Sequence, residues 1–118
     1  MRFAIVENNE TECEQLLSLI RRHSPEGELA FYASTVEQAV EQFRRHADVD
    51  LAFMEVELSD GKSFDAIRRA GLEMPVVFIS AEDLYASKAF KFNSIDYLVK
   101  PLTQVAVDGA IDKFEAFY

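Results

Sequence analysis

The chain has 118 residues, the length of a single domain, and its 49% hydrophobic and 28% charged residues are ordinary for a compact protein. The net charge of −9 disfavours binding to nucleic acid or to an anionic membrane and leaves proteins as the expected partners. The single Cys13 cannot form an internal disulfide, and no apolar run has the length of a signal peptide or membrane span, so we expect a cytoplasmic protein.

The first half of the chain predicts strands that alternate with helices. Apolar runs, typical of strands buried on both faces, cover Phe3 to Val6, Leu29 to Tyr32 and Leu51 to Val56. Between them, apolar residues with helical spacing predict one helix through Cys13, Leu16, Leu17 and Ile20 and another through Val36, Ala39, Val40 and Phe43. Capping-box patterns precede both helices, with Asn9 before Glu12 and Ser34 before Glu37.

The second half continues the same alternation. A short third helix is predicted from Ser63 to Ala70, ending near Gly71, and a fourth around Glu82 to Phe92 with Ala86, Ala89 and Phe90 facing inward. Two further strands cover Val76 to Ile79 and Tyr97 to Val99. A last helix, capped by Thr103, carries its apolar stripe on Val107, Ala110, Ile111 and Phe114.

This alternation predicts one α/β domain over residues 1–118. Right-handed strand–helix–strand units give a five-stranded parallel sheet with helices on both faces, and five such units suit the flavodoxin-like strand order 2-1-3-4-5. Ligand sites in such sheets form beyond the carboxyl ends of the strands. We therefore expect the residues at those ends to converge on one pocket: Glu7, Asn8, Glu55, Ser80 and Lys100.

The residues at these strand ends also resemble a known family. The segments Val6 to Glu10, Leu51 to Gly61, Val77 to Ala81 and Asp96 to Pro101 are similar, in order and spacing, to the signature segments of receiver domains of two-component response regulators. The stretch from Tyr85 through Tyr97 is most similar to receivers of LytTR-type transcriptional regulators. The resemblance covers nearly the whole chain and implies a phosphorelay signalling module with a cis Lys100–Pro101 bond.

In the family, an aspartate accepts a phosphoryl group with the help of Mg²⁺, and a lysine and a Ser/Thr hydroxyl bind that group. By resemblance, Glu55 occupies the phosphoacceptor position and Asn8 replaces a metal-binding acid, while Ser80, Tyr97 and Lys100 match the switch residues. Glu7 and Glu55 are then the remaining metal ligands, for a weak Mg²⁺ site at best and no other cofactor.

These departures favour a pseudo-receiver, a non-enzymatic interaction module in which Glu55 pairs with Lys100 and Ser80 in place of a phosphoryl group. One alternative is a decayed site in which Glu55 is only a solvated carboxylate. Another is a working receiver, phosphorylated on Glu55 by a histidine kinase or a small phosphodonor. A flavodoxin-like cofactor binder is disfavoured because no glycine-rich phosphate loop follows the first strand.

Other polar residues have simpler interpretations. Cys13 is expected to be a core thiol, and His23 and His46 lie near helix ends, too far apart in sequence to suggest a metal site. The side chains of Glu57 and Asp60 are expected to be solvated, although a backbone carbonyl at Glu57 could face a metal.

Partners are expected to be a histidine kinase or an output domain. Receivers commonly dimerise through the fourth helix, fifth strand and fifth helix, where the charged candidates for pairing between subunits are Lys88, Lys91, Asp96, Asp112 and Glu115. By resemblance, a C-terminal LytTR DNA-binding domain would follow Tyr118 and is absent from this chain.

Overall fold

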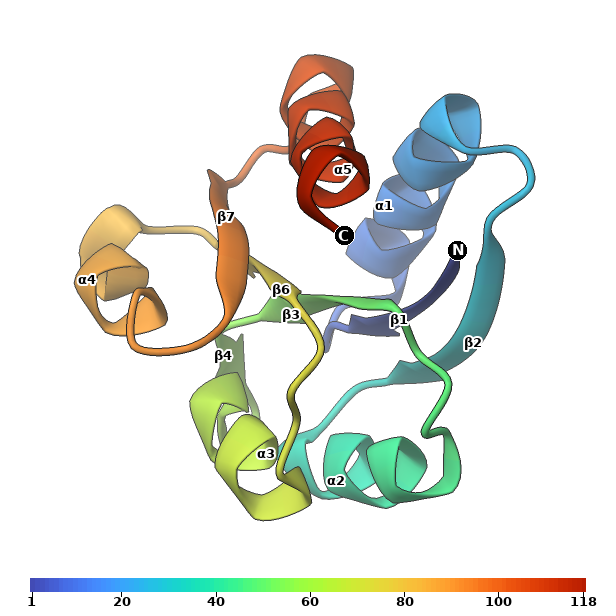
Figure 1. Cartoon of the computed structure of the whole chain (residues 1–118). Coiled ribbons are helices and arrows are strands. Elements are labelled where there is room, and N and C mark those ends of the chain that lie inside the picture. The colour runs from blue at the N-terminus through green and yellow to red at the C-terminus, as the bar shows by residue number, and fades with distance from the viewer.

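A five-stranded parallel sheet forms the centre of the computed structural model, which describes all residues from 1 to 118 (Figure 1). Its strands are β1 (Arg2–Val6), β2 (Glu28–Ala33), β3 (Leu51–Glu55), β6 (Val76–Ser80) and β7 (Ser94–Val99). They pair in the order β2-β1-β3-β6-β7. Counted along the chain, this is the predicted flavodoxin-like order 2-1-3-4-5.

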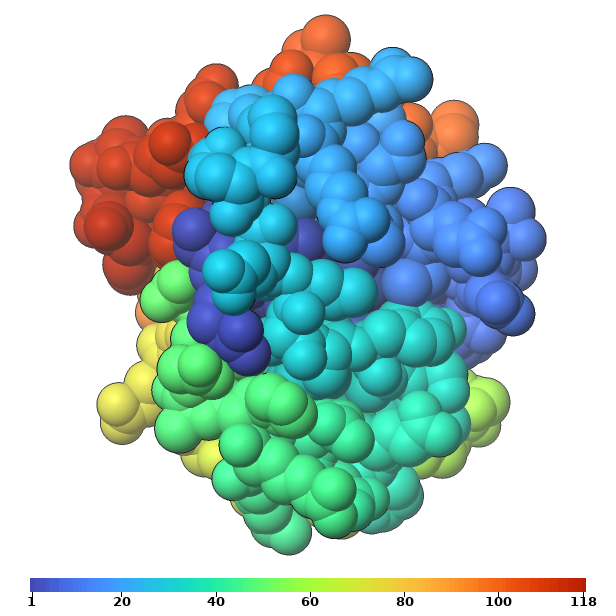
Figure 2. Space-filling model, turned by 90° about the vertical axis from the view of Figure 1, so that its right-hand side faces the viewer, coloured from blue at the N-terminus to red at the C-terminus, as the bar shows by residue number.

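The helices cover both faces of the sheet, as predicted. One face carries α1 (Glu10–His23) and α5 (Gln104–Phe117), and the other carries α2 (Val36–Arg45) and α3 (Ser63–Ala70). Figure 2, which views the molecule from the β2 edge, shows α1 and α5 in the upper part of the molecule and α2 in the lower part. A small antiparallel hairpin of β4 (Glu57–Leu58) and β5 (Gly61–Lys62), which the sequence did not predict, precedes α3.

The sheet separates two hydrophobic cores. Along β1, Phe3 and Ile5 belong to the core under α1 and α5, whereas Ala4 and Val6 belong to the core under α2 and α3. All four side chains are at most 1% exposed. Because each strand must present apolar residues to both layers, its sequence is a continuous apolar run instead of an alternating one.

Most of the predicted helix boundaries are confirmed. The side chains of Asn9 and Thr103 cap α1 and α5, and α3 ends at Gly71 in the left-handed conformation with φ 62°. The predicted Ser34 cap is wrong: Thr35 caps α2, while the amide and hydroxyl of Ser34 both donate to Gln38 Oε1.

The fourth helix is much shorter than predicted. A 3₁₀ turn (η1, Asp83–Tyr85) leads into a single α-helical turn, α4 (Ala86–Ala89). Ala89 is buried as expected, but Phe90 is 86% exposed. Phe92 takes the inward position instead and stacks on Phe64 with the ring centroids 4.9 Å apart. The helix thus ends before Phe92, and the ring of Phe92 packs against the core.

No helix of this structure is both long and apolar enough to cross a membrane.

Candidate functional site: an ammonium held by three carboxylates

The carboxyl ends of the central strands converge on one pocket. Glu7 follows β1, Glu55 and Ser80 end β3 and β6, and Lys100 follows β7. The pocket has a volume of about 670 Å³, and Glu7, Glu55 and Lys100 line it together with residues of α1. The Lys100–Pro101 peptide bond is cis, as predicted. Parallel strands thus bring together residues that lie up to 93 positions apart in the sequence.

The Lys100 ammonium is the centre of the site. It donates to Glu7 Oε1 at 2.7 Å, contacts Glu12 Oε2 at hydrogen-bond distance, and lies 3.3 Å from Glu55 Oε2. The Lys100 side chain is 16% exposed, and those of Glu7 and Glu55 are 5% and 10% exposed. One mostly buried cation therefore faces three carboxylates, two of which are themselves buried.

Glu55 lies inside the pocket and faces Lys100 as expected, but it forms no hydrogen bond with Ser80. Its Oε2 is close to the ammonium but misaligned, so that this buried oxygen accepts no hydrogen bond. No hydrogen bond joins Glu55 to Ser80, although we expected one. The expected ion pair of Glu55 with Lys100 is present at 3.3 Å, but the ammonium lies closer to Glu7 and Glu12.

Burial raises the pKa of a carboxylate, whereas a nearby ammonium lowers it, and both effects act on the acidic residues of this site. Desolvation, together with the hydrogen bond to Glu12, raises the pKa of Glu7 from 4.5 to about 7, against the pull of Lys100. Desolvation also raises the pKa of Glu55, while hydrogen bonds to Glu7 and Lys100 lower that of Glu12. Although burial opposes it, the hydrogen bonds to Glu12 and Glu7 raise the pKa of Lys100, so the ammonium stays charged.

Sequence reasoning missed Glu12 as a member of the site. Glu12 was assigned to a capping box, and its backbone amide does donate to Asn9 Oδ1 at 2.9 Å. Its carboxylate, however, contacts Lys100 instead of completing the box. The first turn of α1 follows directly from the end of β1, so its position next to the predicted pocket was the signal that could have identified Glu12.

The two proposed switch residues meet at one backbone segment. Ser80 Oγ accepts from the amide of Glu82 at 3.2 Å, and the Tyr97 hydroxyl donates to the carbonyl oxygen of Glu82 at 2.6 Å. Ser80 is buried and Tyr97 is half-buried against the core under α2 and α3. Both hydroxyls therefore hold the β6–α4 connection.

The remaining strand-end residues have structural roles. Asn8 is exposed, and its amide donates to Glu7 Oε2 at 3.0 Å. Asp60 accepts from the amides of Val36 and Glu37 at the start of α2, and Glu57 accepts from the Tyr85 hydroxyl. Both side chains are exposed, as expected, and in addition accept these hydrogen bonds.

The carboxylates at the site fit a magnesium ion poorly. Glu7 uses one oxygen for Lys100 and the other for the Asn8 amide, and Glu55 Oε2 faces the same ammonium. Because Lys100 contacts both of the expected metal ligands, Mg²⁺ would have to compete with a charge already in place.

The charged residues expected on the dimer surface are mostly occupied within the chain. Lys113 pairs with Asp96 at 3.1 Å, and His23 lies 2.8 Å from Asp112 and 3.8 Å from Glu115. Lys88 lies over the Phe64 ring, 5.1 Å from its centroid. The contact of His23 with Asp112, which lies 89 positions away on α5, was not predicted from the sequence.

Comparison of the sequence with known proteins finds a matching family model and several relatives. A family model described as the response regulator receiver domain matches residues 3–112. The sensory transduction protein LytR of Streptococcus agalactiae is 35% identical over 92% of this chain and 46% of that protein. LytT of Bacillus subtilis is 31% identical over 98% of this chain and 48% of its own length. The chain thus spans about half the length of the curated relatives it matches.

Solved structures agree on the fold. The response regulatory domain of protein mrkE from Klebsiella pneumoniae superposes with a TM-score of 0.85 at 24% identity, over 98% of this chain and 96% of that one. A chain of the CheX-CheY-BeF3-Mg complex from Borrelia burgdorferi gives a TM-score of 0.84 at 18% identity, over 100% of this chain and 90% of that one.

Proposed function

Since the chain belongs to the response regulator receiver domain family of two-component signalling, we propose that it is a pseudo-receiver, in which the side chain of Glu55 replaces the phosphoryl group. The domain then signals by protein–protein contact, without accepting phosphate. One observation carries this proposal: Lys100 is surrounded by the chain's own carboxylates, from Glu7, Glu12 and Glu55.

The charge at the pocket supports this proposal. A phosphoryl group brings about −1.5 to −2 charges and three acceptor oxygens. Two carboxylates already accept hydrogen bonds from Lys100, and a third lies 3.3 Å away. An incoming phosphodonor would meet these carboxylates while the Lys100 ammonium is already engaged. Both effects oppose phosphorylation.

The length of the Glu55 side chain works in the same direction. Its carboxylate extends one methylene further than an aspartate would, toward the space where the phosphorus atom must approach. A misplacement of about 1 Å can cost on the order of a hundredfold in rate. With Asn8 in place of a metal-binding acid, we propose that Mg²⁺ binds weakly and that the domain uses no other cofactor.

Output is proposed to pass to the transcription machinery through a second domain. The curated relatives are named sensory transduction proteins, and this chain spans about half their length. The other half would hold a DNA-binding domain of the LytTR type, consistent with a net charge of −9 that makes this domain itself a poor DNA ligand. A histidine kinase would be a partner under the alternative of a working receiver that is phosphorylated on Glu55.

A homodimer through α4, β7 and α5 is part of the same proposal. Phe90 and Val99 are 86% and 45% exposed and could supply apolar contact area on this surface. Asp96 and Asp112 would exchange their contacts with Lys113 and His23 for contacts between subunits. Such exposed pairs contribute little each, so the apolar residues would provide most of the interface energy.

Intact mass spectrometry after incubation with acetyl phosphate and Mg²⁺ tests the proposal. We expect no mass gain for the parent chain. The Glu55→Asp, Asn8→Asp double variant restores the acids that the family uses and should gain one phosphoryl group in a Mg²⁺-dependent manner. A phosphoryl group located on Glu55 of the parent chain would contradict the pseudo-receiver and establish a working receiver. An inert double variant would show that Glu12 and the rest of the pocket also block the reaction.

A further inference from the structure

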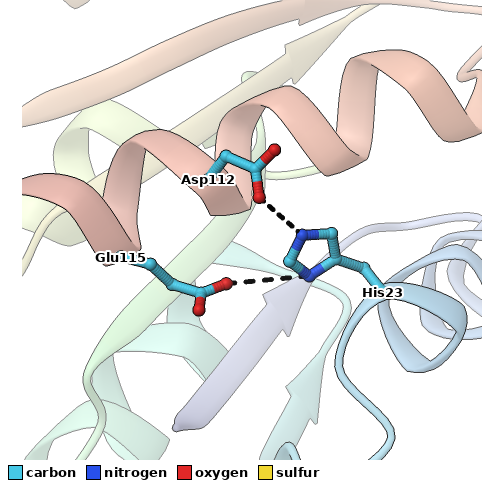
Figure 3. Close-up of side chains that lie close together, drawn as sticks. All are labelled: His23, Asp112 and Glu115. Carbon is cyan, nitrogen blue, oxygen red and sulfur yellow. Dashed lines mark hydrogen bonds and ion pairs between the residues drawn. The ribbon is translucent and has the colours of Figure 1, made fainter.

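A histidine and two carboxylates gather where the C-terminal parts of α1 and α5 meet (Figure 3). His23 is the last residue of α1, and Asp112 and Glu115 lie in the last two turns of α5. Nε2 of His23 is 2.8 Å from Asp112 Oδ1, and Nδ1 is 3.8 Å from Glu115 Oε1. One ligand atom from each residue can be chosen so that all three lie within 4.8 Å of one another.

The surroundings of His23 are compatible with a ligand at Nε2. The Ser24 hydroxyl, which is buried, lies 2.9 Å from Nδ1 and can accept a hydrogen bond from it. With this tautomer the lone pair of Nε2 points toward the Asp112 carboxylate, whereas with the other tautomer Nε2 donates to Asp112 Oδ1 at 2.8 Å and the Ser24 hydroxyl donates to Nδ1. A cation bound at Nε2 would select the first tautomer. Metal-bound histidines commonly donate their other ring N–H in this way.

The local charge also favours a cation. Asp112 and Glu115, three positions apart, share one face of α5 and are formally −2 together. The C-terminal parts of both helices, which carry partial negative charge, are close to the cluster, because His23 is the last residue of α1 and Asp112 and Glu115 lie in the last two turns of α5. Lys113, one of the two residues between them in sequence, is paired with Asp96. The cations nearest in sequence to His23 are Arg21 and Arg22, in the last turn of α1.

Coordination at Nε2 requires the Glu115 carboxylate, which faces Nδ1 at 3.8 Å, to rotate toward Nε2. Ligands bound tetrahedrally to Zn²⁺ at about 2.0–2.2 Å lie about 3.3–3.5 Å from one another. The Asp112 and Glu115 side chains are 70% and 58% exposed, so both carboxylates can rotate to that spacing, while His23 is held at 17% exposure. Imidazole selects transition metals over Mg²⁺ and Ca²⁺.

We infer that His23 Nε2, Asp112 and Glu115 form a binding site for a divalent transition metal ion of the Zn²⁺ type, with water as the fourth ligand. The ion would cross-link the C-terminal ends of α1 and α5. This site is independent of the pseudo-receiver proposal because it lies at the opposite end of α1 from Glu12 and Lys100.

Isothermal titration of the 118-residue chain with Zn²⁺, with and without excess Mg²⁺, tests the inference, together with the melting temperature. We expect one Zn²⁺ per chain, a melting temperature that rises to saturation, and no competition from Mg²⁺. The variants His23→Gln and Asp112→Asn should each weaken binding at least tenfold. Ser24→Ala, which removes the group that orients the imidazole, should weaken it about tenfold.

The other possible zinc ligands serve as controls. His46→Gln and Cys13→Ala remove the second histidine and the buried thiol, and both should bind Zn²⁺ as the parent chain does. Because Asp112 is exposed, Asp112→Asn reports on the site even if His23→Gln unfolds. Absence of Zn²⁺ binding, binding that survives Asp112→Asn, or binding that is lost in His46→Gln would overturn the inference and leave the three residues as an ion pair only.

Discussion

Among the charged residues, Lys100 should contribute most to the free energy of unfolding, because it is the cation of the buried ion pairs. Its replacement by methionine keeps the aliphatic stem but leaves Glu7 and Glu55 buried without a cation. Removal of one partner from a buried ion pair costs about 3–5 kcal/mol. We therefore expect Lys100→Met to lower the free energy of unfolding by about 3 kcal/mol or more at pH 8, measured by urea denaturation. The loss should be smaller at pH 5, where the carboxylates can take up protons.

Lys113 provides the matched control for this substitution. It also forms an ion pair, with Asp96, but its side chain is 52% exposed. Exposed pairs contribute about 1 kcal/mol or less, so Lys113→Met should change stability little. Equal losses for the two variants would mean that the pocket is solvated and that Lys100 is an ordinary surface residue.

Glu7 should make the stability of the domain depend on pH. Its pKa is raised from 4.5 to about 7 in the folded chain, so the folded state holds a proton that the unfolded state has released. The stabilisation is complete below about pH 4.5 and is lost as the pH rises through about 7. We expect denaturant unfolding between pH 5 and 8 to show this decline, and Glu7→Gln to reduce it.

Glu14 is a suitable comparison for Glu7, because it is an exposed carboxylate on α1. Glu14→Gln should keep the decline in stability between pH 5 and 8. If Glu7→Gln kept the full decline as well, the proton would belong to another group.

At the scale of the helices, replacement of glycine by alanine should have opposite effects on stability at two positions. Gly71 ends α3 with φ 62°, where a side chain is strained, so Gly71→Ala should lower the free energy of unfolding by about 1–2 kcal/mol. Gly109 lies inside α5 with no atom within 4 Å of an added Cβ, so Gly109→Ala should raise it by about 0.5–1 kcal/mol. Thermal or urea unfolding measures both, and a loss of stability in Gly109→Ala would contradict this account of α5.

The elements also show where sequence reasoning stops. Strands buried on both faces and helices with strong apolar periodicity were predicted closely, because a single local pattern determines each of them. The segment after β6 was predicted poorly. Phe90 and Phe92 are equally apolar, and the choice between them depends on Phe64, a residue distant in sequence. Long-range packing of this kind leaves no local signal.

At the scale of the whole molecule, some residues of the pocket could likewise be predicted from the sequence and others could not. The parallel topology brings Glu7, Glu55, Ser80 and Lys100 together, because residues at strand ends inherit their positions from the sheet. Glu12 escaped prediction because a capping pattern already accounted for it. The contact of His23 with Asp112 depends on how α1 packs against α5, across 89 positions of sequence.

The central claim is that the chain's own carboxylates occupy the phosphoryl position of the pocket. Beryllium fluoride with Mg²⁺ mimics a bound phosphoryl group, and a ¹H–¹⁵N NMR titration reports whether the pocket accepts it. We predict that the amide signals of Glu55, Ser80 and Lys100 stay unchanged in the parent chain and shift in the Glu55→Asp, Asn8→Asp variant. Saturable shifts of these three signals in the parent chain would contradict the account.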